Sequence, residues 1–390
     1  DMFGRGSFFQ FINRTSIQEG KRALKDLLLS NNIQGIPQRQ EAIKELAKYP
    51  AWMQNYSAIA KGITIEHSAA SIIQWLKNYQ PFLKPFHYWG SLGFILCTVL
   101  VFTAAITETL PINILVYWLI IGLGLTGFYL KRINILAQKT QEAKDTFRQY
   151  ALLLEQIEMK NFDADLLQSY QSKIAYNELK ASRIFKDFSK ALDALDNRNN
   201  LISAIFGNGY LLWDIRQSYR VEQWINRYSK KVEDWFDAVT FFDAYNTLGN
   251  YAFNHQDFTY PTISNDAIVL KCKDLGHPLL RKDKRVASDV TIGKGQFFIV
   301  TGANMAGKST FLRTVALHNI MANTGLPVCA TESQYTPFKL ITSMRTTDSL
   351  TDDSSYFFSE LTRLKIVVDT LSKSSNYFVI LDEILKGTNS

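Results

Sequence analysis

The residues with the clearest chemical potential lie between Gly302 and Thr310, where the sequence reads GANMAGKST. The spacing matches GxxxxGK[ST], in which glycines let backbone amides turn toward phosphate oxygens. Lys308 could reach the β- and γ-phosphates of a nucleotide, and the Ser309 hydroxyl is a ligand type for Mg²⁺. The alternative is an ordinary glycine-rich turn. We predict that the whole segment binds nucleotide: Gly302, Ala303, Asn304, Met305, Ala306, Gly307, Lys308, Ser309 and Thr310.

A second candidate element is the apolar run Tyr377–Leu381, which ends in two carboxylates, Asp382 and Glu383. A buried strand would deliver both side chains beside the phosphate loop. Asp382 would hold Mg²⁺, usually through water, and Glu383 would polarise the water that attacks the γ-phosphate. Many core strands end in acidic residues, so the run is informative because a phosphate loop precedes it. The predicted catalytic residues are therefore Lys308, Asp382 and Glu383, and the predicted Mg²⁺ ligands are Ser309 and Asp382.

A serine pair, Ser354 and Ser355, precedes a helix-like run in which Glu360 lies close to capping-box distance. One interpretation is a simple helix cap. The other is a signature loop that meets a nucleotide bound to a partner subunit.

The elements that must position these residues follow from Pro261 onward. Short β-rich runs alternate there with helical stretches, which predicts an α/β domain with a mainly parallel sheet. A strand before the loop and a helix beginning near Phe311 would place the phosphates at a helix N-terminus, where the backbone carries partial positive charge. The predicted strands are Ala267–Lys271, Phe297–Thr301, Lys339–Met344 and Tyr377–Leu381.

Two uncharged stretches stand out earlier in the chain, from Pro85 to Thr107 and from Thr109 to Leu130. Each has the roughly 20 apolar residues that a helix needs to span a bilayer. Lys84 precedes the pair and Lys131 and Arg132 follow it, so the positive-inside rule places both flanks in the cytoplasm. We predict a transmembrane helical hairpin at 85–130 in the cytoplasmic (inner) membrane. A pair of buried core helices is the alternative.

Residues 1–84 and 131–260 carry apolar residues at spacings of three and four, which predicts helices. The predicted fold class is mixed. An all-α helical core (1–84 and 131–260), lever-like, is interrupted by the hairpin (85–130) and followed by an α/β P-loop (ABC-type) ATPase domain (261–390).

The amino-acid composition excludes some classes of protein and some kinds of site. The chain has 390 residues, 46% hydrophobic and 20% charged, with a net charge of +7. These values exclude intrinsic disorder, and the charge permits an anionic partner without requiring one. The three cysteines, Cys97, Cys272 and Cys329, lie far apart, so neither a disulfide framework nor a zinc site is expected. A haem site is not expected either.

Several segments together resemble the MutS family of ATPases. TGANMAGKSTFLRTVAL at 301–317 is similar to that family's phosphate loop, and residues 344–361 resemble its signature segment. LDEILKGTNS at 381–390 resembles its second nucleotide motif, and His277-Pro278 matches the start of its ATPase domain. Near the N-terminus, Ile12-Asn-Arg-Thr-Ser, Gly20-Lys-Arg and Arg39-Gln resemble the start of its helical core (lever) domain. The Asn-Met-Ala-Gly-Lys-Ser-Thr and Leu-Lys-Gly-Thr-Asn-Ser forms match a membrane-associated MutS-like subgroup.

This resemblance implies specific roles. Asn304, Lys308, Ser309 and Thr310 would bind ATP and Mg²⁺, and Ser355 would contact the γ-phosphate across a homodimer formed through the ATPase domain. The hairpin lies roughly where the family carries its DNA clamp, and no counterpart of its mismatch-reading domain precedes the core in this sequence. The chain begins with Asp and stops just after the second motif, so we expect a fragment with an incomplete ATPase domain, for which turnover is uncertain.

Three functions remain open at this point. The first is a Mg²⁺-dependent ATPase that acts on mismatched or branched DNA at the membrane. The second is a membrane-anchored mechanochemical ATPase whose partner is a membrane protein or lipid. The third is a scaffold that binds nucleotide without turnover.

Overall fold

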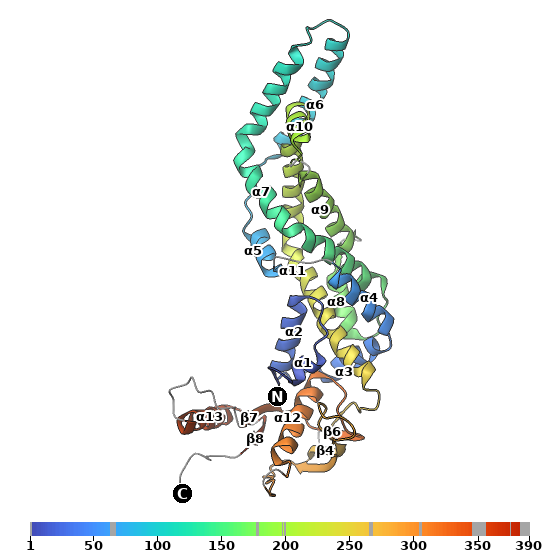
Figure 1. Ribbon diagram of the computed structural model, residues 1–390, viewed down its shortest axis with the longest axis vertical. Helices are drawn as coiled ribbons and strands as arrows, with labels where there is room; N and C mark the ends of the chain where they lie inside the picture. The colour runs from blue at the N-terminus through green and yellow to red at the C-terminus, as the bar shows by residue number, and fades with distance from the viewer. Residues whose placement is uncertain are drawn as a thin grey trace.

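The computed structural model describes residues 2–62, 68–176, 179–196, 198, 200–264, 268–303, 306–344, 356–374 and 376–382. The molecule is elongated, with helices along most of its length (Figure 1). The loop between α6 and α7 lies at one end, and the strands with helices α12 and α13 lie at the other.

Five helices form the N-terminal part: α1 (Phe8–Ile12), α2 (Gln18–Leu29), α3 (Ile36–Ala47), α4 (Pro50–Lys61) and α5 (Ala69–Asn78). Pro37 and Pro50 lie in the first turns of α3 and α4, where a missing N–H costs no helical hydrogen bond. Leu24 and Leu28 are one turn apart in α2 and both are buried, as their spacing predicts. The predicted helical character of this part is confirmed.

The two uncharged stretches form α6 (Pro85–Ile106) and the first part of α7 (Ile114–Met159). Both are long and apolar enough to cross a membrane, and only 11% of each apolar window is buried. A core helix would be largely covered, so the structure does not support the interpretation as core helices. No break marks residue 130, because α7 runs unbroken for 46 residues into the helical body.

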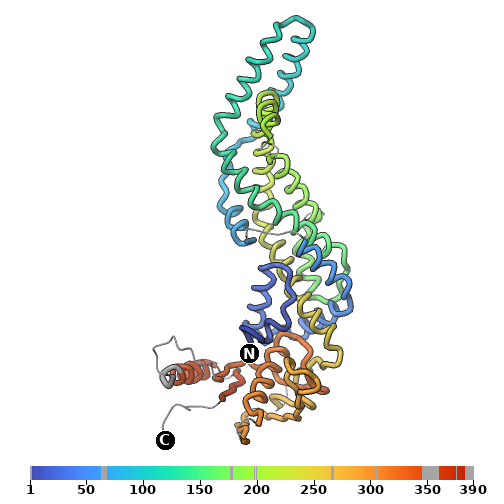
Figure 2. The backbone as a smooth tube through the Cα atoms, viewed as in Figure 1, coloured from blue at the N-terminus to red at the C-terminus, as the bar shows by residue number. Residues whose placement is uncertain are grey.

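The rest of the helical body contains α8 (Asp165–Lys173), a short antiparallel pair β1 (Ala175–Tyr176) and β2 (Leu179–Lys180), α9 (Ala181–Asp196), α10 (Leu201–Leu211) and α11 (Trp213–Asn254). Helix α11 runs down the molecule beside α7 and α9 (Figure 2). Aromatic rings fill the space between these helices, and Phe188 stacks on Trp224 with centroids 3.7 Å apart. Phe147 meets Phe185 edge-to-face. Such pairs add to the free energy gained from apolar burial.

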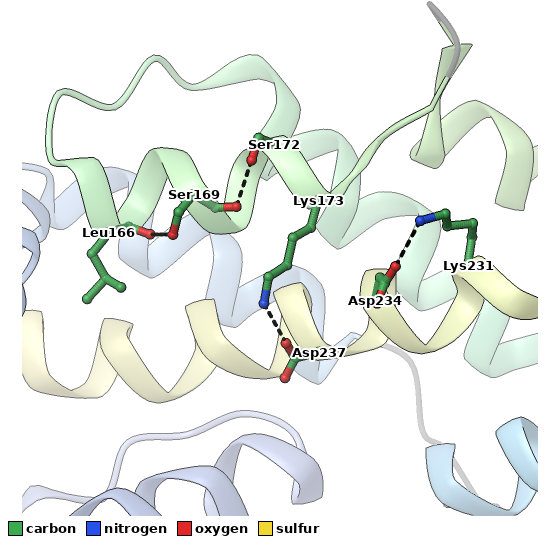
Figure 3. A network of polar contacts seen from close by, with 7 residues as sticks. All are labelled: Leu166, Ser169, Ser172, Lys173, Lys231, Asp234 and Asp237. Atoms are coloured by element: carbon green, nitrogen blue, oxygen red, sulfur yellow. Dashed lines mark hydrogen bonds and ion pairs between the residues drawn. The ribbon is translucent and has the colours of Figure 1, made fainter. Parts of the chain in front are cut away.

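A polar network lies on the outside of this body (Figure 3). Lys173 of α8 pairs with Asp237 of α11 at 3.1 Å, and Lys231 pairs with Asp234 within α11 at 3.2 Å. Ser172 and Ser169 donate to carbonyl oxygens one turn earlier in α8. Because these groups are exposed, each ion pair contributes at most about 1 kcal/mol to stability. The aromatic interior therefore contributes more to holding α8 and α11 in place.

Apart from the β1–β2 pair, the described strands form two separate sheets. The order in the larger sheet is β3 (Thr262–Ile263), β6 (Glu332–Tyr335), β4 (Ile268–Leu275) and β5 (Ser288–Gly293). The smaller sheet pairs β7 (Lys339–Ser343) with β8 (Tyr377–Leu381). Helix α12 (Lys308–Thr324) and helix α13 (Tyr356–Leu371) accompany them.

The expectation of a mainly parallel sheet is wrong for the larger sheet. Its β4 pairs antiparallel with both β5 and β6, and only β3 and β6 are parallel. No helix intervenes between β4 and β5, and a parallel pair needs a long crossover connection. The β7–β8 pair is parallel, as expected, with α13 between its strands.

The predicted strand at Phe297–Thr301 is also absent as a strand. The segment pairs with no other strand among the described residues, and the Phe297 side chain is 88% exposed. Apolar, β-prone residues form a strand only where a neighbouring strand offers its backbone groups. Here a cavity separates the segment from β8. The predicted runs at 339–344 and 377–381 contain β7 and β8. The run at 267–271 covers only the first half of β4, which continues to Leu275, and residue 267 lies outside the described residues.

Candidate nucleotide-binding site

The phosphate-loop residues lead directly into α12. Gly307 adopts the left-handed conformation at φ 87°, which favours glycine, and is the N-cap of the helix that begins at Lys308. The Phe311 amide donates to the Gly307 carbonyl oxygen at 2.9 Å, closing the first turn. The loop therefore lies at the positive end of a 17-residue helix, a favourable position for an anion.

The Lys308 side chain folds back toward Gly302 and Ala303, the described start of the loop. Its Nζ donates to the carbonyl oxygens of Gly302 at 2.6 Å and Ala303 at 3.2 Å. The ammonium group thus lies within reach of the loop backbone that the sequence predicts to surround phosphate. Ser309 is half-buried and Thr310 is exposed in the same first turn of α12, and Ala306 and Gly307 are exposed before it.

The carboxylate residue Asp382 follows directly on β8. Its backbone amide donates to the Ser343 carbonyl oxygen at 2.9 Å, which extends the β7–β8 ladder by one residue. Ile380, two residues earlier, is buried, so the strand anchors the position of Asp382.

One cavity of about 970 Å³ brings the two ends of the site together, because both Lys308 and Asp382 line it. Its remaining walls are largely apolar, with Phe297–Val300 on one side and β8 residues on the other. The two functional residues belong to segments 74 positions apart in the sequence. The structure therefore brings together the lysine and the carboxylate that the sequence analysis paired.

Four predicted site residues lie outside the described residues: Asn304, Met305, Ser355 and Glu383. The two interpretations of the serine pair, a helix cap or a signature loop, therefore both stay open. The helix that the pattern predicts after the serine pair is α13, whose backbone begins at Tyr356.

The residues present suit Mg²⁺ and a nucleotide by donor chemistry. Mg²⁺ prefers oxygen ligands, usually one or two carboxylates together with phosphate oxygens. Asp382 supplies a carboxylate on the cavity wall and Ser309 a hydroxyl in the first turn of α12. The ammonium group of Lys308 supplies the compensating positive charge. These oxygen donors suit Mg²⁺ bound with a nucleotide better than they suit a softer metal, which prefers thiolate or imidazole ligands.

The residues that hydrogen-bond α12 to the helical body were not predicted from the sequence. Arg39 of α3 is buried, and its Nε and Nη2 donate to the Asn323 carbonyl oxygen at 3.1 and 2.7 Å. The same guanidinium donates to Gln34 and Asn32 carbonyl oxygens. Burial lowers the pKa of Arg39 from its ordinary value. The C-terminal turn of α12 is therefore held by a charged group satisfied through backbone carbonyls.

A second fastening joins the helical body to β7. The Asn31 side-chain amide donates to the Leu340 carbonyl oxygen and accepts from the Leu340 amide, both at 2.7 Å. The side chain thereby imitates a strand neighbour. Gln40 adds a bond from Nε2 to the Pro261 carbonyl oxygen at 2.9 Å. Single polar residues in a helical region gave no pattern by which these contacts could have been predicted.

Comparison with known proteins shows which proteins this chain is similar to. Residues 298–390 match the family model described as MutS domain V. The chain is 33% identical over 152 residues to the DNA mismatch repair protein MutS of Pseudothermotoga lettingae, an alignment that covers 38% of this chain and 18% of that protein. It is 31% identical over 159 residues to human MutS protein homolog 4, covering 40% and 16%.

A third relative, the MutS of Protochlamydia amoebophila, is 30% identical over 209 residues, covering 52% of this chain. The alignment spans 22% of that relative, so the chain matches less than a quarter of the length of each of these three proteins. The matched segment contains the phosphate loop from residue 302, Asp382 and Glu383. Residues 298–390 therefore belong to domain V of the MutS family.

Proposed function

We propose that the protein is a membrane-anchored MutS-type ATPase that binds MgATP between α12 and the end of β8. The observation that carries the proposal is the shared cavity of Lys308 and Asp382, with α12 beginning at Lys308. The relatives named DNA mismatch repair proteins support an ATPase that acts in connection with DNA.

Each residue has a defined role in this proposal. Backbone amides of residues 302–310 and the Lys308 ammonium bind the phosphates of ATP, with Asn304, Met305 and Thr310 completing the loop. Asp382 and Ser309 would hold Mg²⁺, which would supply positive charge beside the phosphate oxygens. Glu383 orients the attacking water and accepts its proton. In a homodimer, Ser355 would contact the γ-phosphate of the nucleotide bound to the partner subunit.

Helix α12 is suited to transmit the state of this site. Its N-terminus holds the phosphate loop, and its C-terminal turn is bonded to Arg39 of α3. Gly325, at φ 91°, ends the helix and packs directly against Arg39 and Gln40, leaving no room for a side chain. A displacement at one end of such a rigid element reaches the other end, so nucleotide binding would move the helical body.

The apolar hairpin supports a membrane location. In α6 and the first part of α7 the apolar side chains are largely exposed, and lipid is the environment in which such a surface is stable. Lys84, Lys131 and Arg132 at its base favour the cytoplasmic side for both soluble parts. We accordingly place the protein in the membrane-associated MutS-like subgroup, at the cytoplasmic (inner) membrane, with domains at 1–84, 85–130, 131–260 and 261–390.

A membrane partner is the second candidate function, favoured by the position of the hairpin. It extends from the end of the helical body opposite the strands (Figure 1), so nucleotide-driven motion of the body would reach the membrane. DNA and a membrane partner differ in their dependence on salt, because phosphate contacts release counterions.

The test uses the full-length protein in proteoliposomes. ATP hydrolysis should be lost in Glu383→Gln while ATP binding is retained, and unchanged hydrolysis would contradict the catalytic proposal. Duplex and mismatched DNA are then titrated with and without ATP at several salt concentrations. Affinity that falls steeply with salt supports the DNA function. Absence of DNA binding, together with ATPase activity that depends on the lipid environment, supports the membrane partner.

A further inference from the structure

A third uncharged stretch runs from Asn199 to Trp213, far from the hairpin in sequence. Its described part, from residue 200 onward, lies beside the hairpin in space. It contains α10, which contacts both α6 and α7 (Figure 1). Helix α10 has 11 residues, so it is about 16 Å long and too short to cross a bilayer core of about 30 Å.

The contact between α10 and α7 is close. A side-chain carbon at Gly122 of α7 would overlap the carbonyl oxygen of Gly209 in α10. A side-chain carbon at Gly209 would in turn overlap Leu119. Small residues that let two helix backbones touch are typical of helix packing inside membranes, where dispersion contacts hold helices together.

Three polar side chains of this three-helix cluster, Thr98, Trp118 and Tyr210, find hydrogen-bond partners within it. The Thr98 hydroxyl of α6 lies 2.8 Å from the Tyr210 carbonyl oxygen and accepts the Trp118 indole N–H at 2.8 Å. The Tyr210 hydroxyl donates to the Leu115 carbonyl oxygen at 3.2 Å. In hydrocarbon, backbone and hydroxyl groups must be satisfied internally, and these bonds meet that requirement.

The turn that ends α10 is satisfied as well. Leu212, which is buried, adopts the left-handed conformation, and its amide donates to the Gly207 carbonyl oxygen. The side chain of Asn208 is also buried, and its Oδ1 accepts the Asp214 amide at 2.9 Å. Irregular backbone of this kind is tolerated at membrane depth only where protein covers it.

The charged residues at the two ends of the uncharged stretch form an ion pair with each other. Arg198 Nε lies 3.2 Å from Asp214 Oδ2, and Arg198 also donates to Asn134 Oδ1, just beyond the apolar part of α7. The chain therefore enters and leaves the uncharged stretch at one place, at the base of the hairpin. Between these ends, α10 exposes Leu201 (73%), Ile202 (68%) and Phe206 (52%).

We infer that α10 is a re-entrant membrane helix, which enters the acyl-chain region of the bilayer from the side of the helical body and returns without crossing. The inference rests on the proposed membrane hairpin and adds a third element to its lipid-facing surface. The occupant of the exposed α10 face is lipid hydrocarbon. The helix also widens the contact between the membrane and α11, which begins immediately after it.

The test places a fluorescent label at single cysteines in the full-length protein, in a Cys97→Ser background. Cys272 and Cys329 are buried, and the background protein without an added cysteine measures their labelling. Labels are placed at Ile202→Cys on α10, Leu100→Cys on α6 and Lys186→Cys on the exposed face of α9. The protein is reconstituted into phosphatidylcholine–phosphatidylglycerol vesicles with and without acyl-brominated lipid, which quenches only groups in contact with hydrocarbon.

We expect quenching at positions 202 and 100 and none at 186. Quenching at 100 without quenching at 202 would overturn the re-entrant helix and leave the hairpin intact. Absence of quenching at both positions would overturn the hairpin and the inference together. Self-quenching between labels at 202, without an effect of brominated lipid, would show that a second copy covers α10 and would equally overturn the inference.

Discussion

At the residue scale, the absence of a side chain at Gly20 of α2 leaves room for the buried carboxyl group of Asp243. Its α-carbon faces Asp243, and an added Cβ would overlap the carboxylate. That carboxylate accepts the Ser16 and Ile17 amides at 3.0 and 3.1 Å, which fixes the start of α2.

We expect Gly20→Ala to lower the free energy of unfolding by about 1–3 kcal/mol, since overpacking would push Asp243 away from the two amides. Gly124→Ala is the matched control, because nothing lies within 4 Å of an added Cβ there. Thermal unfolding in detergent measures both variants. A Gly20→Ala midpoint equal to that of the control would contradict this packing.

The same carboxylate predicts a pH dependence. Burial raises the pKa of Asp243 from 3.8 to about 7, and it outweighs the Ile17 and Ser16 amides and Lys61, which lower the pKa; Glu19 raises it further. The folded state therefore holds this proton more tightly than the unfolded state does. Its contribution to stability is fully present below about pH 4 and is lost as the pH rises through about 7.

Unfolding midpoints of the native protein and Asp243→Asn should consequently differ in their pH profiles. Between pH 5 and pH 8 the native protein should lose stability from this group, whereas the variant, which cannot ionise at this position, should lose less. Parallel profiles over that range would show that the carboxylate keeps its ordinary pKa.

At the element scale, α12 is fixed at its C-terminal turn by Arg39, whose buried guanidinium binds carbonyl oxygens of Asn323, Gln34 and Asn32. Removing a buried donor leaves its acceptors unsatisfied, at a cost of about 1–3 kcal/mol.

We therefore expect Arg39→Ala to lower stability by that amount and to speed amide exchange in the last turn of α12. Arg39→Lys should recover only part of the loss, because an ammonium group lacks the planar fork of donors. Arg22→Ala, at an exposed position in α2, is the control. Hydrogen exchange that is unchanged at α12 in Arg39→Ala would contradict the role of this contact.

Several elements could be predicted from periodicity and motif alone, and the exceptions have physical causes. α12 and β8 follow from local pattern, since Lys308 begins a helix after glycine and Tyr377–Leu381 is a continuous apolar run. Phe297–Thr301 has an equally strand-like composition, but no strand pairs with it among the described residues. The packing of helix α10 against α6 and α7 was not predicted, because its uncharged stretch is too short to span a bilayer. Its hydrogen-bond partners Leu115 and Thr98 lie 95 and 112 positions away in the sequence.

At the scale of the whole molecule, the site and the hairpin lie at opposite ends of a long helical body (Figure 2). Two direct fastenings, Arg39 to Asn323 and Asn31 to Leu340, join that body to the elements beside the cavity. The candidate site could be predicted residue by residue because a phosphate loop is local in sequence. The fastenings could not, because each depends on one polar side chain meeting backbone more than 280 positions away.

The measurement that tests the nucleotide site most directly is the affinity of the full-length protein for MgATP, by equilibrium binding of a fluorescent ATP analogue. Lys308→Ala should weaken binding about tenfold or more, since losing a charge-assisted hydrogen bond costs about 1.5–3 kcal/mol. Lys273→Ala, at an exposed position on β4, should leave the affinity unchanged. Equal affinities for the native protein and Lys308→Ala would contradict the proposed nucleotide site.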